Sequence, residues 1–264
     1  MTGLAPARKG GCLRRLLSGL LILMVATAAE ARVFDQSQEK FGSYLRATAA
    51  NWSNGDSPFS QSSGTGSTNF SSTYTLLPSY EFGFLYRTTP LVWRLGFEFL
   101  QPNSLTNVTG GTSSTPYFSL NSNLSVVAAK LELEFNLKQW KQSRVWLLGG
   151  AGAGFLTLDN SYTLTSAGTT QFPTVSNFKE EIKGQTLMYD MGLGFETLMS
   201  DTTTFFVEGG YRVMDFSNLS HNSAATTFQG AVTVGGSATT NSGAARDINL
   251  GTFYLGLGFR VWVF

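Results

Sequence analysis

Charged residues in this chain recur at every second position of segments that are otherwise apolar. In LVWRLGFEFL, residues 91–100, Arg94 and Glu98 share one phase with Gly96, and the other phase holds only leucine and aromatic residues. Residues two positions apart lie on the same face of a β-strand, so this pattern gathers cations and carboxylates on one face. The chemistry that such residues support is ion pairing, which strengthens where a pair is removed from water.

The same charged phase recurs along nearly every predicted strand. This face carries six basic and seven acidic residues. The two numbers are nearly equal, as packed ion pairs require, because an unpaired buried charge is costly. The predicted ion network consists of Arg46, Glu81, Arg87, Arg94, Glu98, Lys130, Glu132, Glu134, Asp190, Glu196, Glu208, Arg212 and Arg260.

A second candidate chemistry is general-base catalysis by His221, the only histidine of the chain. It precedes Ser223 by two positions, and this spacing resembles the histidine–serine pair of PagL-type lipid A deacylases, which are barrels. A serine hydrolase also needs a carboxylate to orient its histidine, and the next acid along the chain is Asp247. The surrounding segment is rich in serine, threonine and asparagine, which favours a solvated loop histidine. We therefore expect a protein that is not an enzyme.

Cofactor and metal sites lack candidate ligands. The single cysteine, Cys12, precedes the apolar run of the leader described below, and one histidine with scattered carboxylates does not make a metal site. Glycines 149, 150, 152 and 154 do not have the spacing of a phosphate-binding loop, and close packing inside a barrel explains them better. We predict neither a cofactor nor a metal.

The first 31 residues have the features of a cleaved signal peptide. A basic region up to Arg15 is followed by an apolar run, Leu16 to Ala26, and by the small-x-small sequence Ala29-Glu30-Ala31. Cleavage before Arg32 leaves a single domain, residues 32–264, with 14 basic and 16 acidic residues. This charge excludes a basic surface for nucleic acid.

Eight segments of the mature chain alternate between apolar and polar residues, and we predict that they form the β-strands that carry the charged residues. The segment from Val145 to Leu158 has aliphatic residues in both phases, so its facing stays open. The predicted strands are residues 41–52, 80–87, 91–100, 128–137, 145–158, 187–196, 205–213 and 252–264.

Short and long connections alternate between these strands. Links of a few residues follow the second, fourth and sixth strands, whereas connections rich in Ser, Thr, Asn and Gly follow the others, at about 51–72, 102–119, 159–184 and 215–247. Residues 117–124 and 228–234 are candidates for hairpins that extend strands. The last loop, 215–247, therefore either contains a further hairpin or does not, and both alternatives stay open. This alternation is typical of outer-membrane barrels, with short periplasmic turns and long extracellular loops.

The aromatic face is the one that we expect outside. A soluble barrel of eight strands has barely enough interior room for its side chains, and it could not accept dozens of Phe, Leu, Tyr and Trp. A solvated face of an ordinary antiparallel sheet is the alternative for the charges, but the signal peptide and the loop pattern favour a lipid-facing exterior. The predicted lipid-facing residues are Tyr80, Phe82, Phe84, Tyr86, Trp93, Leu95, Phe97, Phe99, Leu131, Leu133, Phe135, Leu193, Phe195, Tyr211, Leu257 and Phe259.

The sequence resembles the small eight-stranded outer-membrane barrels of Gram-negative bacteria, of the OmpA, OmpX and OmpW type. The resemblance rests on LGFE at Leu95 and Leu193, LGFR at Leu257, the glycine-rich GGAGAGF strand and a final strand that ends in Phe264. It implies an all-β, antiparallel up-and-down barrel, and it implies that Phe264 is part of the signal read by the barrel-assembly machinery. Phe264 alternates with Trp262 rather than with the apolar face, so either a bulge lies near the end or the signal is atypical.

The expected function is a structural or cell-surface interaction role, with a lumen plugged by ion pairs. The expected partners are outer-membrane lipid and lipopolysaccharide, the assembly machinery, and a surface ligand or protein bound by the loops. Aromatic residues of the loops are candidates for contact anchors and, equally, for groups that pack within the loops: Phe59, Phe70, Tyr117, Phe172, Phe178 and Phe228. A channel for small or apolar solutes is the main alternative, and a lipid A-modifying hydrolase a minor one.

Overall fold

A closed ring of β-strands forms the body of the protein in the computed structural model, which describes residues 35, 38–53, 58–59, 69–112, 114–240 and 243–263. Eight antiparallel strands are hydrogen-bonded in the order β1–β3–β4–β6–β7–β8–β9–β14, and β14 pairs with β1 to close the ring. The predicted eight-stranded up-and-down barrel is confirmed. The ring strands are β1 (Phe41–Asn51), β3 (Leu76–Thr88), β4 (Leu91–Leu100), β6 (Pro116–Gln139), β7 (Ser143–Leu164), β8 (Phe178–Ser200), β9 (Thr203–Phe216) and β14 (Thr252–Val263).

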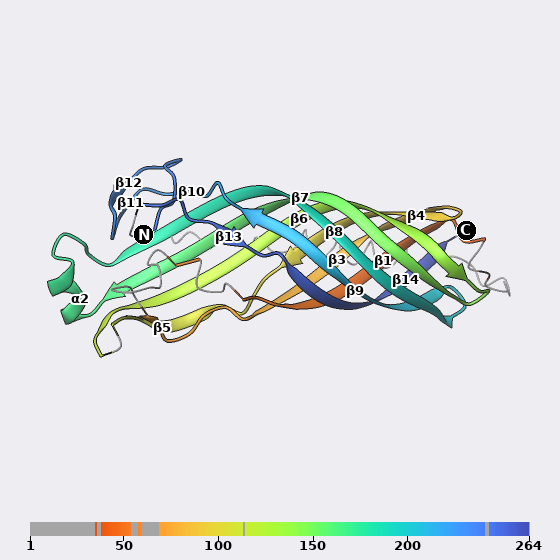
Figure 1. Ribbon diagram of the computed structural model, residues 1–264, viewed down its shortest axis with the longest axis horizontal. Helices are drawn as coiled ribbons and strands as arrows, with labels where there is room; N and C mark the ends of the chain where they lie inside the picture. The colour runs from red at the N-terminus through yellow and green to blue at the C-terminus, as the bar shows by residue number, and fades with distance from the viewer. Residues whose placement is uncertain are drawn as a thin grey trace, which may run out of the picture. The chain divides into compact units, whose positions relative to one another are not determined.

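The smaller elements gather toward one end of the barrel, away from the end where the C-terminus lies (Figure 1). The short helix begins after Thr165, whose hydroxyl accepts a hydrogen bond from the amide of Gly168 and so caps it. No helix in the described ranges is long and apolar enough to cross a membrane. These elements are β2 (Asn69–Phe70), β5 (Leu105–Gly111), α2 (Ser166–Gln171), β10 (Ser220–His221), β11 (Ala225–Thr227), β12 (Gly230–Val232) and β13 (Ile248–Asn249).

Three adjacent strands are much longer than predicted. β6, β7 and β8 have 24, 22 and 23 residues and stay in register over most of that length. The expected long loop 159–184 is therefore wrong, since only residues 165–177 connect β7 to β8. Residues 117–124 do extend β6. The predicted segment 228–234 instead contains β12, which pairs with β11 in a separate hairpin and does not continue a ring strand.

The polarity of the outer face changes along the long strands. On β6, the outward positions from Val127 to Leu137 are Val, Ala, Leu, Leu, Phe and Leu, whereas those from Ser119 to Ser125 are Ser, Asn, Asn and Ser. The change falls at Ser125, which pairs with Thr157 of β7. Eleven residues span about 33 Å along a strand and about 24 Å across a membrane at a 45° tilt, which matches the apolar band of a transmembrane barrel.

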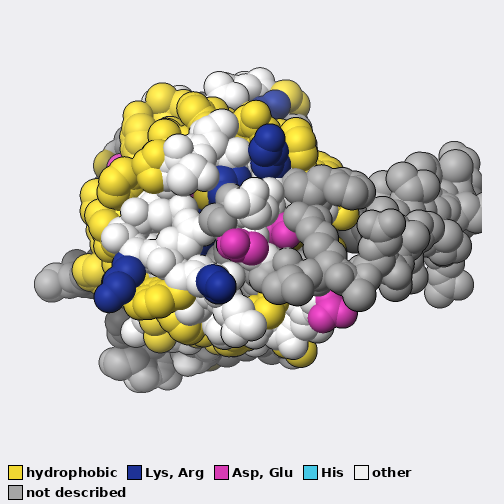
Figure 2. Space-filling view, turned by 90° about the vertical axis from the view of Figure 1, so that its right-hand side faces the viewer, with side chains coloured by type: hydrophobic (Ala, Val, Ile, Leu, Met, Phe, Trp, Pro, Cys, Tyr) yellow, Lys and Arg dark blue, Asp and Glu magenta, His cyan; other side chains and the backbone are white. Residues whose placement is uncertain are grey.

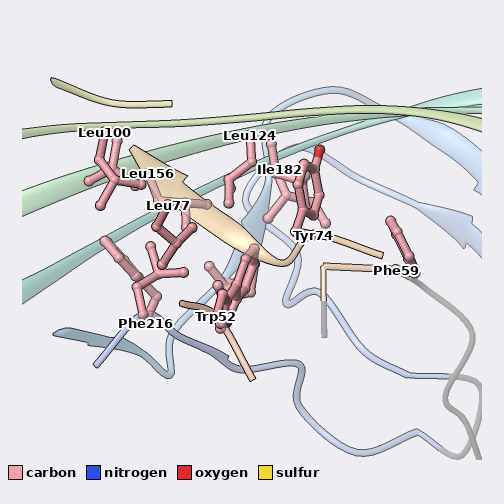
Figure 3. Close-up of a cluster of buried hydrophobic side chains, with 14 of the residues drawn as sticks. Trp52, Phe59, Tyr74, Leu77, Leu100, Leu124, Leu156, Ile182 and Phe216 are labelled. Carbon is pink, nitrogen blue, oxygen red and sulfur yellow. The ribbon is translucent and has the colours of Figure 1, made fainter. Parts of the chain in front are cut away.

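The inner face of the barrel changes in polarity in the opposite direction along the strands. Level with the apolar band, the inner face carries charged residues, and a small apolar cluster around Trp146, Phe206 and Trp262 lies among them. Beyond the band, the inner face becomes apolar, and residues from the connections pack against it (Figure 3). The prediction that the inside is the polar side is thus correct for the banded part and wrong for the extended part.

The end of the barrel with the short turns also differs in polarity between its margin and its middle. Hydrophobic side chains gather along much of its visible margin, uncharged polar side chains lie toward the middle, and charged side chains lie in both places (Figure 2).

Candidate functional site: the barrel interior

Ion pairs cross the barrel from wall to wall. β4 and β9 are four places apart in the ring of eight, and β6 and β14 are likewise on opposite walls. Arg94 of β4 lies 3.0 Å from Glu208 of β9, and Arg212 of β9 lies 2.5 Å from Glu98 of β4. Side chains that meet across the diameter fill the cross-section that an aqueous pore would need.

Arg94 and Lys130 are the centres of this network. The guanidinium of Arg94 lies within 3.1 Å of carboxylate oxygens of Glu132, Glu134 and Glu208. The ammonium of Lys130 contacts four carboxylates at 2.7 to 3.3 Å: Glu81, Glu98, Glu132 and Asp190. Each cation thus joins several strands, which distributes its charge among fixed partners.

Other residues of the predicted ion network extend it toward both ends of the barrel. Arg46 of β1 pairs with Glu81 and Glu208, and the hydroxyl of Tyr44 donates to Glu81. Arg260 of β14 reaches Glu134 across the barrel at 2.6 Å. The structure therefore brings all but one of the thirteen predicted charged residues into contact with an opposite charge.

The exception is Arg87, which is buried but has no carboxylate partner within the described residues. Its guanidinium lies 4.4 Å from the ring centroid of Trp262, and it stacks there as a cation over an aromatic face. The indole nitrogen of Trp262 in turn donates to Glu196 at 3.0 Å. Arg87 is thus joined to the network through an aromatic side chain rather than through an ion pair.

Sequence reasoning missed Arg144, which belongs to the network. It lies 2.6 Å from Glu134 and 2.7 Å from Glu196. With Arg144, seven cations balance seven carboxylates. A signal was present, because Arg144 has the phase of Trp146, but β7 carries aliphatic residues in both phases and its inner face could not be chosen from the sequence. The structure places Trp146, Leu148, Leu156 and Leu158 inside.

Glycines on the inner face make room for the network. A Cβ added at Gly150 would meet the side chain of Glu132, and one added at Gly96 would meet Glu81 and Tyr44. The glycine-rich segment of β7 therefore serves close packing, as expected, and it continues as strand rather than turning into a helix.

The predicted lipid-facing residues all lie on the outer face. Fifteen of the sixteen are more than a third exposed, from Phe97 at 36% to Tyr80 at 68%, and Leu133 is partly buried. Further apolar residues share this face, among them Phe41, Leu45, Leu147, Phe155, Leu187, Tyr189, Met191, Phe253 and Leu255.

The extended part of the barrel holds a second polar cluster that the sequence did not indicate. Glu180 of β8 accepts two hydrogen bonds from Arg246, at 3.0 and 3.1 Å, and Asn160 of β7 donates to the carbonyl oxygen of Pro58 at 2.9 Å. His221 lies beside them with its Nδ1 4.0 Å from Glu180 Oε1. Burial lowers the pKa of His221, and Arg246 adds to this effect while Glu180 opposes it.

The expectation of a solvated His221 is therefore wrong, because this residue is only 2% exposed. The acid beside it is Glu180, and not Asp247, because the pairing of β10 with β8 brings residues 221 and 182 together. Glu180 does not orient His221 as a hydrolase carboxylate would, because it accepts hydrogen bonds from Arg246 and none from His221 Nδ1, and no hydrogen bond joins His221 to Ser223 among the described residues.

Loop aromatics pack against one another. Phe59 lies 4.5 Å from Phe70 between ring centroids, and Phe228 lies within 5.1 Å of both Phe172 and Phe178. Packing within the loops, one of the two predicted roles, explains these residues. The signal peptide and Phe264 lie outside the described residues.

Comparisons with known proteins find similar solved structures at low sequence identity. No protein-family model and no curated protein sequence matches the chain. Among solved structures, OprG from Pseudomonas aeruginosa is similar, with 14% identity, 88% of this chain and 99% of that chain covered, and a TM-score of 0.47. AlkL, an outer-membrane protein, has 11% identity over 90% and 95% of the chains with a TM-score of 0.40. Ail, the attachment invasion locus protein of Yersinia pestis, has 13% identity over 84% and 99% with a TM-score of 0.38. The barrel topology itself is given by the strand pairing of this chain, in which β14 closes the ring on β1.

Proposed function

We propose that this protein is an integral outer-membrane barrel with a closed interior, and that its role is structural or one of surface interaction through its extracellular part. The observation that carries this proposal is the set of ion pairs that cross the barrel, such as Arg94 with Glu208 and Arg260 with Glu134. Breaking a buried ion pair costs about 3–5 kcal/mol, so the network opposes transient opening.

The apolar band supports a position within lipid. Large exposed apolar side chains surround the barrel over a height of about 24 Å, and water would disfavour that surface. Outer-membrane lipid and lipopolysaccharide are the partners that this surface fits. Export through the cleaved leader 1–31, and recognition of Phe264 by the barrel-assembly machinery, remain parts of this proposal.

The extended part of β6, β7 and β8 is then the extracellular region. Its outer face is polar, with Asn121, Ser161 and Lys179 among its exposed residues, and its inner face encloses the apolar core of Figure 3. Such an arrangement presents a folded, water-compatible surface to the medium, on which an external ligand or protein partner would bind.

Conductance measurements test the closed interior. Refolded protein in planar bilayers is expected to give no stable current steps, whereas the double variant Arg94→Ala with Glu208→Ala removes a pair that crosses the diameter and is expected to conduct. Lys179→Ala, on the exposed outer face, is the matched control and stays silent. Stable steps from the unmodified protein that change when Glu132 or Arg94 is replaced would contradict the proposal.

Lysine accessibility tests the orientation. Lys179 and Lys183 lie on the outer face beyond the apolar band, whereas Lys138 and Lys141 lie at the end with the short turns. A membrane-impermeant amine reagent applied to intact cells should modify the first pair and spare the second, and all four should react after lysis. Modification of Lys138 and Lys141 in intact cells would reverse the assigned orientation.

Passage of apolar solutes is a second candidate, favoured by the apolar interior of the extended part. Leu124, Leu158 and Ile182 line this region and are fully buried, and segments from the connections cover them. If these segments separate, an apolar molecule would meet an apolar wall. Cells that contain the protein would then accumulate toluene faster than matched cells that lack it, and equal rates would exclude this role.

A further inference from the structure

The connection between β9 and β14 folds back over the apolar interior of the extended part. We call its described residues 217–240 and 243–250 the strap. Its apolar side chains Leu219, Ala238, Ile248 and Leu250 are at most 4% exposed and belong to the same core as Ile182 of β8. The strap is therefore the cover of this core on one side.

Few backbone contacts hold the strap to the ring. The two-residue strand β10 pairs with Ile182 and Lys183, and the amide of Asn222 donates to the carbonyl of Glu181 at 2.7 Å. Near its other end, β13 pairs with β9, and the amide of Leu250 donates to the carbonyl of Met214 at 2.8 Å. These short pairings contrast with the continuous ladders of the ring, so the strap is joined to the ring by fewer backbone hydrogen bonds than the ring strands share with one another.

A buried ion pair joins the strap to the wall. Arg246 of the strap donates to both oxygens of Glu180, and it also donates to the carbonyl of Thr239 at 3.1 Å within the strap. The same guanidinium reaches the carbonyl of Pro58, and Asn160 of β7 donates to that carbonyl as well. One carboxylate and one guanidinium thus connect the wall, the strap and the segment at Pro58.

His221 is the group of this cluster whose side chain type titrates near neutral pH when exposed. Its Nδ1 is buried without a hydrogen-bond partner, 4.0 Å from Glu180, and its backbone exchanges hydrogen bonds with Gly235 and Gly236 of the strap. The groups that face it are Glu180 of β8 and Arg246 of the strap. Lys183 and Glu181 of the same strand lie on the outer face.

We propose that His221, Glu180 and Arg246 form an acid-sensitive latch, and that protonation of His221 releases the strap from the extended part of the barrel. A protonated His221 places a second cation against a single carboxylate that already pairs with Arg246, in a site from which water is largely excluded. Release separates the two cations and hydrates them. This regulation goes beyond the closed scaffold of the proposed function.

The direction of the effect follows from linkage. Burial lowers the pKa of His221 in the closed state, whereas an exposed histidine titrates near 6.5. The open state therefore binds a proton more readily, and the closed state loses stability as the pH falls below that value. At neutral and alkaline pH both states hold a neutral imidazole, and the strap stays closed.

Cysteine labelling tests the latch in the folded protein. Cys12 belongs to the predicted leader, so the mature chain has no cysteine, and Ala238→Cys introduces a thiol at a position that is 1% exposed in the strap. Its maleimide reaction rate is divided by that of Thr226→Cys, an exposed position of the same strap, which removes the pH dependence of the thiol. We expect this ratio to rise severalfold between pH 7.5 and pH 5.5.

Two further variants identify the cause. His221→Gln should abolish the rise while leaving a low ratio at both pH values, and Glu180→Gln should give a high ratio at both, because Arg246 then has no carboxylate. A ratio that does not change with pH, or one that rises equally in His221→Gln, would overturn the proposal. Heat-dependent gel mobility establishes that each variant has a folded barrel.

Hydrogen exchange keeps the proposal testable if Ala238→Cys fails to fold. The amides of Ala238 and Leu250 are bonded to Leu219 and Met214, and in the unmodified protein their exchange, corrected for the intrinsic rate, should accelerate at pH 5.5. The amide of Leu131, within the ring, is the reference and should not accelerate. Equal protection of the strap amides at both pH values would also overturn the latch.

Discussion

Arginine substitutions along the outer face of β6 measure where the membrane lies. Leu131, which pairs with Leu95 of β4, is 51% exposed and lies near the middle of the apolar run from Val127 to Leu137, whereas Val127 lies at its edge and Asn121 lies beyond it. An arginine on the lipid face costs about 2–4 kcal/mol at the midplane and about 0–1 kcal/mol near the interface. Leu131→Arg should therefore shift the folding equilibrium by roughly 30- to 1,000-fold, since each 1.4 kcal/mol is tenfold.

The assay is equilibrium unfolding by guanidinium chloride in lipid vesicles, followed by gel mobility and tryptophan fluorescence. Val127→Arg should cost about 0–1 kcal/mol, and Asn121→Arg, the control on the same strand, should lie within about 0.5 kcal/mol of the unmodified protein. Leu95→Arg should match Leu131→Arg because the two residues are register partners. Equal stability of Leu131→Arg and Asn121→Arg would show that this face does not contact lipid, and the assignment of faces would be reversed.

Three other substitutions test the interior. Arg94→Ala leaves up to four buried carboxylates without this partner and should cost about 3–5 kcal/mol in the same unfolding assay, whereas a cost near zero would remove its central role. Trp52 is 4% exposed in the apolar core of the extended part, and Trp52→Ala should cost about 3–5 kcal/mol in the unfolding assay. The substitution should also increase proteolysis of the extended part while the heat-dependent gel mobility of the barrel persists. Gly258→Ala directs a methyl group at the backbone oxygen of Leu45 and at Phe206, so it should cost about 1–3 kcal/mol by overpacking, and an unchanged midpoint would contradict this packing.

Alternation alone was enough to identify the ring strands. The period of two is a property of the extended backbone, so segments such as Leu91–Leu100 can be predicted with their exact bounds, and the charged and apolar faces separate without knowledge of the neighbours. The number of ring strands and the alternation of short and long connections follow from the same pattern.

The ends of the long strands were not predictable in this way. Residues 159–164 and 178–184 are mostly polar, and their pattern favours a loop. In the structure these two segments pair with each other and the first also pairs with β6, so hydrogen bonding to neighbouring strands compensates for their weak alternation. From Ser125 toward Ser119, the outward side chains of β6 are polar and the inner face is apolar. The arrangement of polar residues inside and apolar residues outside is therefore reversed in this part of the strand.

What the sequence by itself determined is the set of faces: which residues of a ring strand point together and, within the apolar band and apart from β7, that charges and apolar groups lie on opposite sides of the wall. Only the tertiary structure decided which charges meet, because the partners of Arg94 and Arg260 lie across the barrel and depend on the strand order and register. It also decided that Arg144 joins the network, that Arg87 stacks on Trp262 and that His221 is buried beside Glu180. These contacts join residues that are 10 to more than 100 positions apart and rest on closure of the ring, and no local pattern contains that information.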